Sequence, residues 1–302
     1  MSVFLGTTNT DSTGSSANLN AGNATGEVDK VYHEDGVDGV VTGTSKDTYD
    51  FDTVTVVSDE WNKDGYKEAK IDGSFEVITV EDFVDVDIQN AADSGFSHIH
   101  LLNTKRGQID TTGSDSNDSI FIAVESNTNT WSNKFVVETG AGNDVIEMVD
   151  VLNSKHTEFD ISLGDGNDTA DVSQLQTALD GSKERIIDGG KGLDVLVTNG
   201  DTQLVFSGFE VIQGDNFGAG SQLTLDATAL ANNANPLGLV VSNLDLSFDE
   251  ASIDGSIHHD LNAFQEYYVE QLGFDAENFA AVEVAVDGQK YVVLTDDADY
   301  LA

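Results

Sequence analysis

The stretch IIDGGKGLDVLV, residues 186–197, places three glycines and two aspartates inside an aliphatic run that otherwise has the composition of one buried β-strand. Glycine reaches positive φ without steric cost, so this spacing predicts a tight corner between two short strands. In such a corner the backbone carbonyls turn inward and Asp194 adds a carboxylate. The stretch therefore indicates a strand, an oxygen-rich corner and a second strand.

The same pattern occurs four times along the chain. The segments GSDSNDSIF (113–121), TGAGNDVIE (139–147), LGDGNDTAD (163–171) and GGKGLDVLV (189–197) align without gaps. Their shared aspartates recur at intervals of 26, 24 and 26 residues; they are Asp118, Asp144, Asp168 and Asp194. A fixed interval between strand-forming segments is typical of a solenoid. The sequence therefore predicts stacked coils, each with one corner of this kind.

The corners are candidate calcium sites. One corner offers too few oxygens for Ca²⁺, which takes roughly six to eight, whereas two stacked corners share enough. We expect the four aspartates to bind Ca²⁺ together with backbone carbonyls of neighbouring glycines, namely Gly142, Gly166, Gly190 and Gly192. Asp115, Asp165 and Asp188 are second-rank candidates. The alternative for each single copy is an ordinary turn rich in Gly, Asn and Asp without a ligand.

These segments resemble the RTX (repeats-in-toxin) calcium-binding family, whose repeat has the form G-G-x-G-x-D-x-U-x. Only 189–197 matches the whole pattern; the segments at 139 and 163 lack the first glycine, and 113–121 has serine for two glycines. GTSKDTYDF at 43–51, with Asp47 as its aspartate, and FEVI at 75–78 and 209–212 extend the similarity. The resemblance implies an all-β, right-handed parallel β-helix or β-roll-like solenoid with calcium-binding corners.

Three regions are expected along the chain. Residues 1–30, rich in Ser, Thr, Asn and Gly, predict a flexible N-terminal arm, and residues 31–230 the solenoid. Residues 231–302 predict a small α+β cap with a hairpin at Asp287-Gly288 and a helix at 259–273. We expect this helix to be capped by Asp260 and to bury a face that includes Phe264 and Tyr267. A second, shorter helix is predicted at 172–180. The end of the chain also resembles a type I secretion signal.

Charge and composition exclude several classes. The chain has 302 residues, 13 Lys and Arg against 55 Asp and Glu, and a formal charge of −42, so it lacks the basic surface that binds nucleic acid. A cation is the natural partner, although an acidic surface adapted to salt is the alternative. The absence of cysteine excludes disulfides and zinc-thiolate sites. No run of about 18 apolar residues predicts membrane insertion.

No catalytic motif is visible, and we do not expect an enzyme. His98 with His100 and His258 with His259 are candidate metal pairs, but neither pair has a matched third ligand in the sequence. H-E-x-x-H and G-x-S-x-G are absent. Carboxylate pairs for polysaccharide cleavage remain open, although basic residues and tryptophans, here Trp61 and Trp131, are few.

These features favour a secreted, calcium-dependent structural protein at the cell surface that self-assembles into a surface layer, filament or matrix. Its expected partners are calcium and further copies of itself, with cell-surface polysaccharide as an additional candidate. The resemblance implies that it is closest in style to RTX-like surface-layer proteins. The alternatives are a virion structural component, a polysaccharide-cleaving enzyme, or an adhesin on the same scaffold.

Overall fold

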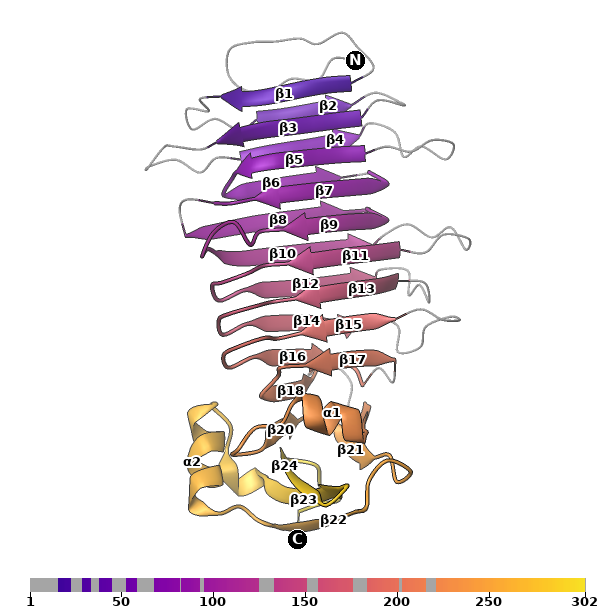
Figure 1. Cartoon of the computed structure of the whole chain (residues 1–302), viewed down its shortest axis with the longest axis vertical. Coiled ribbons are helices and arrows are strands. Elements are labelled where there is room, and N and C mark those ends of the chain that lie inside the picture. The colour runs from indigo at the N-terminus through magenta and orange to yellow at the C-terminus, as the bar shows by residue number, and fades with distance from the viewer. Residues whose placement is uncertain are drawn as a thin grey trace.

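The computed structural model describes residues 16–22, 29–33, 38–44, 53–58, 68–81, 83–92, 95–124, 133–150, 157–175, 184–200, 203–215 and 221–301. These residues are mostly in β-strands, which stack into an elongated parallel β-solenoid that ends in a small α+β cap (Figure 1). The predicted all-β solenoid is therefore confirmed. In the described part of the chain, no helix is long and apolar enough to cross a membrane.

Two long sheets form the walls of the solenoid. The odd-numbered strands form a 9-stranded sheet: β1 (Ser16–Gly22), β3 (Asp38–Thr44), β5 (Glu68–Ser74), β7 (Asp85–Asn90), β9 (Arg106–Asp110), β11 (Asn133–Glu138), β13 (Thr157–Ser162), β15 (Arg185–Asp188) and β17 (Leu204–Ser207). The even-numbered strands begin a 13-stranded sheet: β2 (Asp29–His33), β4 (Thr53–Ser58), β6 (Val77–Glu81), β8 (Phe96–Leu102), β10 (Asn117–Val124), β12 (Val145–Asp150), β14 (Thr169–Gln174), β16 (Val195–Thr198), β18 (Val211–Gly214) and β20 (Leu239–Ser242).

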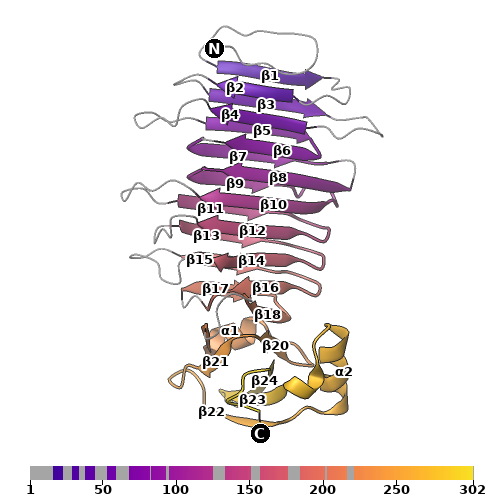
Figure 2. The same ribbon diagram turned by 180° about the vertical axis from the view of Figure 1, so that it is seen from behind.

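The chain alternates between the two sheets, so each coil contributes one strand to each wall. In Figure 1 the odd-numbered strands cross the near side and the even-numbered strands return behind them, which makes the coil right-handed; Figure 2 shows the reverse side. Ser119 pairs with Val145, Val145 with Thr169, and Thr169 with Val195. This register places the four aligned copies directly above one another.

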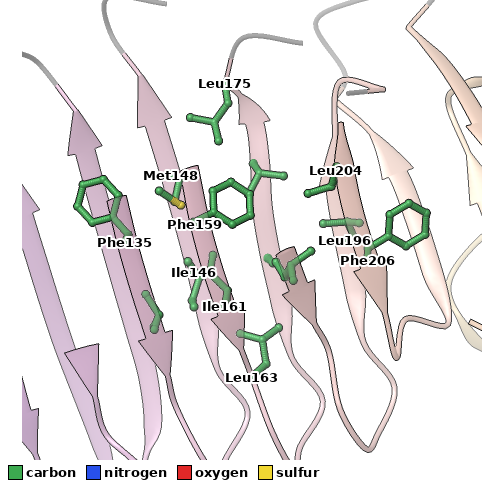
Figure 3. Packing of buried hydrophobic residues seen from close by; sticks show 14 of the residues in the cluster. Phe135, Ile146, Met148, Phe159, Ile161, Leu163, Leu175, Leu196, Leu204 and Phe206 are labelled. Carbon is green, nitrogen blue, oxygen red and sulfur yellow. The ribbon is translucent and has the colours of Figure 1, made fainter. Parts of the chain in front are cut away.

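The core lies between the two sheets. Side chains alternate across each strand, so one set points inward; β11 and β13 follow this alternation. Figure 3 shows inward side chains of successive coils, among them Phe135, Met148 and Phe159, all at most 2% exposed. Each coil is thus stabilised mainly by the apolar residues of its neighbours.

Truncation of this core is expected to be costly. Phe135→Ala removes a fully buried ring between two neighbouring coils and should lower the free energy of unfolding by about 3–5 kcal/mol. Phe264→Ala, at a side chain that is 78% exposed, should change it by less than about 0.5 kcal/mol. Chemical denaturation of both variants measures the difference, and equal effects would contradict the described packing.

The cap closes the C-terminal end of the solenoid. It contains α1 (Ala227–Asn232), the parallel pair β19 (Gln222–Leu225) and β21 (Asp245–Phe248), α2 (Ala263–Gln271) and a short 3₁₀ helix, η1 (Ala276–Asn278). The long sheet continues through β20 to β24 (Gln289–Thr295), β23 (Ala280–Val286) and β22 (Gly255–Asp260). The predicted hairpin is confirmed: Asp287 and Gly288, with φ of 50° and 78°, join β23 to β24.

The helix prediction for the cap was wrong in its start and its buried face. Asp260 and the two preceding histidines lie on β22, and Asn262 caps α2 through a capping box with Gln265. The helix buries Gln265 and Val269, whereas Phe264 and Tyr267 are 78% and 62% exposed. Val269 packs in a cluster with residues of β18, β20, β23 and β24, and this tertiary contact decides the face.

Two further expectations differ from the structure. The short helix predicted at 172–180 is wrong where the chain is described, because Thr169–Gln174 forms β14. Strand pairing also begins inside the segment predicted as an arm, since Ser16–Gly22 pairs in parallel with β3. The parallel sheet likewise extends beyond residue 231, because β20 continues it.

Candidate cation site

The glycine-rich segments form one row of corners along the solenoid. Residues 139–144, 163–168 and 189–194 each join an odd-numbered strand to the next even-numbered strand. The amide of Asp165 donates to the carbonyl of Gly140 at 2.7 Å, and the amide of Lys191 donates to the carbonyl of Gly164 at 2.7 Å. The corners therefore hydrogen-bond to one another as the strands do, and the repeat is continued through the turn.

The four aligned aspartates form a buried column in these corners. Asp118, Asp144, Asp168 and Asp194 are at most 2% exposed. The backbone amide of each of the first three donates to Oδ1 of the next aspartate along the column, at 2.7, 2.7 and 2.9 Å. Each Oδ1 thus links two coils, and the alignment predicted from the sequence is a physical contact.

Three of these carboxylates have an oxygen without a partner. Oδ2 of Asp144, Asp168 and Asp194 is buried and accepts no hydrogen bond. The Thr139 hydroxyl lies close enough to Asp144 to offset part of the rise that burial causes in its pKa, but its proton is donated to the Leu163 carbonyl at 2.6 Å. A buried polar atom without a partner costs about 1–3 kcal/mol, and more when it is charged. The column therefore places three unsatisfied carboxylate oxygens along one line inside the protein, where a proton or a cation would stabilise them.

Asp118 differs from the other three. Its two oxygens accept hydrogen bonds from the hydroxyls of Ser97, Thr111 and Ser116. Ser116 stands where the next copies have glycine, and Ser97 belongs to the preceding coil. Hydroxyl donors thus satisfy this carboxylate, and the structure gives no reason to place a cation beside it.

The column continues beyond the predicted aspartates at both ends. The amide of Asp194 donates to Oε2 of Glu210 at 2.9 Å, and the strand register aligns Glu76 with Ser97 at the other end. Both glutamates belong to the FEVI tetrapeptides. The sequence analysis noted the tetrapeptides but did not assign their glutamates to the site. The signal they share with Asp144-Val145-Ile146 is an acidic residue followed by a β-prone residue and an aliphatic one.

The surroundings of the carboxylates change along the column. Backbone hydrogen bonds between coils align four different residues at the end of the odd-numbered strands, namely Thr111, Thr139, Leu163 and Gly189. Of these, Thr111 donates to Asp118, and a Cβ at Gly189 would lie 2.9 Å from Cβ of Asp194. Burial raises the pKa of all four aspartates, to about 6 for Asp144 and to about 7 for Asp194. Neighbouring carboxylates add to the effect at these two residues, since like charges disfavour ionisation.

Backbone carbonyls approach the same column. A Cβ at Gly166 would lie 1.5 Å from the carbonyl oxygen of Gly142 and 2.8 Å from Oδ1 of Asp168. A Cβ at Gly192 would lie 1.4 Å from the carbonyl oxygen of Gly166. At these glycines the carbonyl oxygen of one coil therefore lies where a side chain of the next coil would stand, close to the carboxylate column.

This arrangement fits an oxygen-binding cation held largely by the backbone. Within the described ranges no three His, Cys, Asp or Glu side chains converge on one point, so a cation would bind one or two carboxylates and take its other ligands from carbonyls and water. Ca²⁺ accepts such a set. The carbonyls of Gly142 and Gly166 lie against Gly166 and Gly192 of the next coil, and Gly190 packs in the same way against the Gly164 carbonyl, which already accepts a hydrogen bond from the Lys191 amide.

The second-rank candidates do not join the column. Asp115, Asp165 and Asp188 are exposed. Asp165 forms an ion pair with Lys191 at 2.7 Å, and Asp188 accepts a hydrogen bond from Ser207 at 2.9 Å. In a strand–corner–strand unit, alternate side chains leave on opposite sides, and these three leave outward.

The other candidates fall into two groups. His98 and His100 are exposed on the outer face of β8, where their rings lie against Phe96 and Phe121 at centroid distances of 5.6 and 6.0 Å. His258 lies on β22 against Tyr300 at 6.5 Å. Asp47, Trp61 and Trp131 lie outside the described residues.

The raised pKa values predict an unusual pH dependence for the metal-free protein. The folded state holds protons that the unfolded chain releases near pH 4, so this stabilisation is complete below that pH and is lost as the pH rises through about 6 and about 7. We expect the melting temperature in calcium-free buffer to fall between pH 5.5 and 7.5, where exposed carboxylates are already ionised. A melting temperature that is constant over this interval would contradict the unsatisfied column.

No protein-family model matches the chain, and neither a curated protein nor a solved structure does so.

Proposed function

We propose that this protein is a calcium-dependent structural protein of the extracellular space that self-assembles. The observation that carries the calcium part is the line of buried, unpartnered carboxylate oxygens on Asp144, Asp168 and Asp194. A formal charge of −42 supports it, because self-repulsion of the chain decreases when divalent cations bind.

The chemistry of the column favours calcium over other metals. Its donors are oxygens only, which disfavours zinc and copper, since these prefer imidazole and thiolate ligands. Mg²⁺ demands a small octahedral shell and keeps several waters, whereas Ca²⁺ tolerates irregular sets of carboxylates and carbonyls. The buried carboxylates of Asp144, Asp168 and Asp194, together with backbone carbonyls of the corners, therefore suit Ca²⁺ best.

Calcium dependence also supports an extracellular location. A cation that binds only between stacked coils binds only the folded chain, so its binding free energy contributes to folding. A chain with these carboxylates would fold poorly where calcium is scarce and well where calcium is abundant, which is outside the cell. The resemblance of its last residues to a type I secretion signal agrees with export of an unfolded chain.

A structural role is supported by the distribution of the described residues. Nearly all of them belong to the solenoid walls or to its cap, and the molecule is elongated, with β1 and the cap at opposite ends (Figures 1 and 2). Such a shape suits a subunit of a surface layer, filament or matrix. The same elongated shape would also suit a structural component of a virion, which is the alternative function.

The test is a calcium titration of the purified protein after chelation at pH 7.5. We expect calcium to raise the melting temperature and negative-stain electron microscopy to show ordered sheets or filaments only when calcium is present. Magnesium at the same concentration serves as the control and should have a much smaller effect. Dispersed particles in all conditions would contradict self-assembly, and an unchanged melting temperature would contradict the calcium site.

A further inference from the structure

The last strand of the long sheet, β22, has an open edge. Among the described strands the 13-stranded sheet ends at β22, which pairs only with β23. All six of its residues are exposed. Its outer row of backbone N–H and C=O groups is therefore accessible to another strand.

This edge lacks the features that usually prevent strand addition. Natural edge strands are blocked by lysine, proline, bulges or a covering segment. The sequence of β22, GSIHHD, contains neither lysine nor proline, and its register with β23 runs without a shift from Gly255 to Asp260. Ile257 is 70% exposed at its centre. The strand is thus regular, open and partly apolar.

The opposite end of the same sheet offers a matching edge. Among the described strands, β2 is the terminal strand there, and Figures 1 and 2 place it at the far end of the molecule from β22. The two strands carry little charge in a chain of −42: β22 contains one carboxylate, Asp260, and β2, DKVYH, contains Asp29 and Lys30. Lys30 disfavours pairing of β2 with a second β2, whereas β22 offers it an edge whose one charged residue is acidic. The two strands themselves therefore meet with nearly balanced charge.

We propose that β22 of one molecule pairs with β2 of a second copy, so that the long sheet continues from molecule to molecule. This proposal rests on the self-assembly in the proposed function and names the surface that produces it. The two edges differ, so the contact is head-to-tail, and because they lie at opposite ends of an elongated molecule, repeated contacts extend a filament (Figure 1). The exposed Phe264 and Tyr267 of α2, which starts three residues after β22, add apolar area at the same end.

The test compares two lysine variants of the full chain in millimolar calcium. Ile257→Lys places a charge on the open edge and should abolish filaments in negative-stain microscopy and pelleting in the ultracentrifuge. Leu237→Lys makes the same charge change at a cap residue that is 39% exposed and away from this edge, and it should assemble like the wild type. Both variants should keep the melting temperature and calcium response of the wild type.

Two proline variants serve as a second test. Backbone N–H groups alternate in direction along a strand, so Ile257→Pro and His258→Pro remove one group that faces β23 and one that faces the open edge. The proline that removes an N–H facing β23 breaks a hydrogen bond within the molecule and should lower the melting temperature. The proline that removes an N–H on the open edge should keep the wild-type melting temperature but prevent assembly.

The outcomes separate this inference from the function on which it rests. Wild-type filaments one molecule wide, absent in Ile257→Lys and in the stable proline variant, support the head-to-tail pairing. Filaments that persist in both variants overturn the pairing but leave calcium-dependent assembly intact. A wild type that binds calcium yet never assembles overturns the self-assembly and this inference together.

Discussion

Replacing Asp168 by asparagine is expected to have opposite effects in the absence and presence of calcium. The amide keeps an oxygen for the Asp144 backbone N–H but removes a buried charge that disfavours ionisation of Asp144 and Asp194. At pH 7.5 without calcium, the variant should be more stable than the wild type by roughly 1–3 kcal/mol. That difference corresponds to about 2–4 °C per kcal/mol in a domain of this size.

With calcium the order should reverse. The variant loses a carboxylate ligand in the middle of the column, so saturating calcium should raise its melting temperature much less than that of the wild type. Scanning calorimetry with chelator and with calcium measures both differences. A variant that is less stable than the wild type in chelator, with an unchanged calcium response, would contradict a cation site at Asp168.

Two other Asp→Asn variants serve as controls for the reversal expected of Asp168→Asn. Asp165→Asn changes an exposed carboxylate paired with Lys191, and it should shift stability by less than about 0.5 kcal/mol in both conditions. Asp118→Asn removes a carboxylate that three hydroxyls satisfy, so it should destabilise the protein with and without calcium. The reversal is thus expected only for aspartates with an unpartnered oxygen.

Gly166→Ala should be among the most destabilising substitutions in the corners. Its Cβ would lie 1.5 Å from the carbonyl oxygen of Gly142, a backbone atom that moves only if the stacked coils separate. The backbone of Gly166 lies outside the positive-φ region, so the effect is steric. We expect a loss of about 4 kcal/mol or more, or a failure to fold, and no calcium stabilisation.

The matched control is Gly95→Ala. Gly95 has a φ of 84°, and a Cβ there would meet nothing within 4 Å. This variant carries only the cost of the left-handed backbone, about 1–2 kcal/mol. Urea denaturation of both proteins separates the two effects, and a Gly166→Ala protein as stable as Gly95→Ala would contradict the close stacking of the corners.

Stacking of the coils was predictable because its signal is periodic. Backbone-to-carboxylate hydrogen bonds join Asp118, Asp144, Asp168 and Asp194, and they connect residues that are 26, 24 and 26 positions apart in the sequence. Any solenoid that buries one aspartate per coil must repeat it once per coil. The fold class and the column therefore followed directly from the alignment of the four segments.

Other features depend on contacts that a single segment does not contain. The satisfied state of Asp118 comes from Ser97 and Thr111, which belong to other strands, so the segment 113–121 alone does not reveal it. The buried face of α2 is set by packing of Val269 against several strands of the cap. The outward direction of Asp165 is set by the alternation of side chains through the corner and by its ion pair with Lys191.

The most direct test of the cation site is isothermal titration of the chelated protein with calcium at pH 6, repeated in buffers of different ionisation enthalpy. Asp144 and Asp194, with pKa values of about 6 and about 7, hold protons there that a bound cation must displace. We expect saturable binding whose heat changes with the buffer because protons are released. Absence of binding would contradict a cation site altogether, and binding without proton release would place calcium on exposed carboxylates and contradict a site in the buried column.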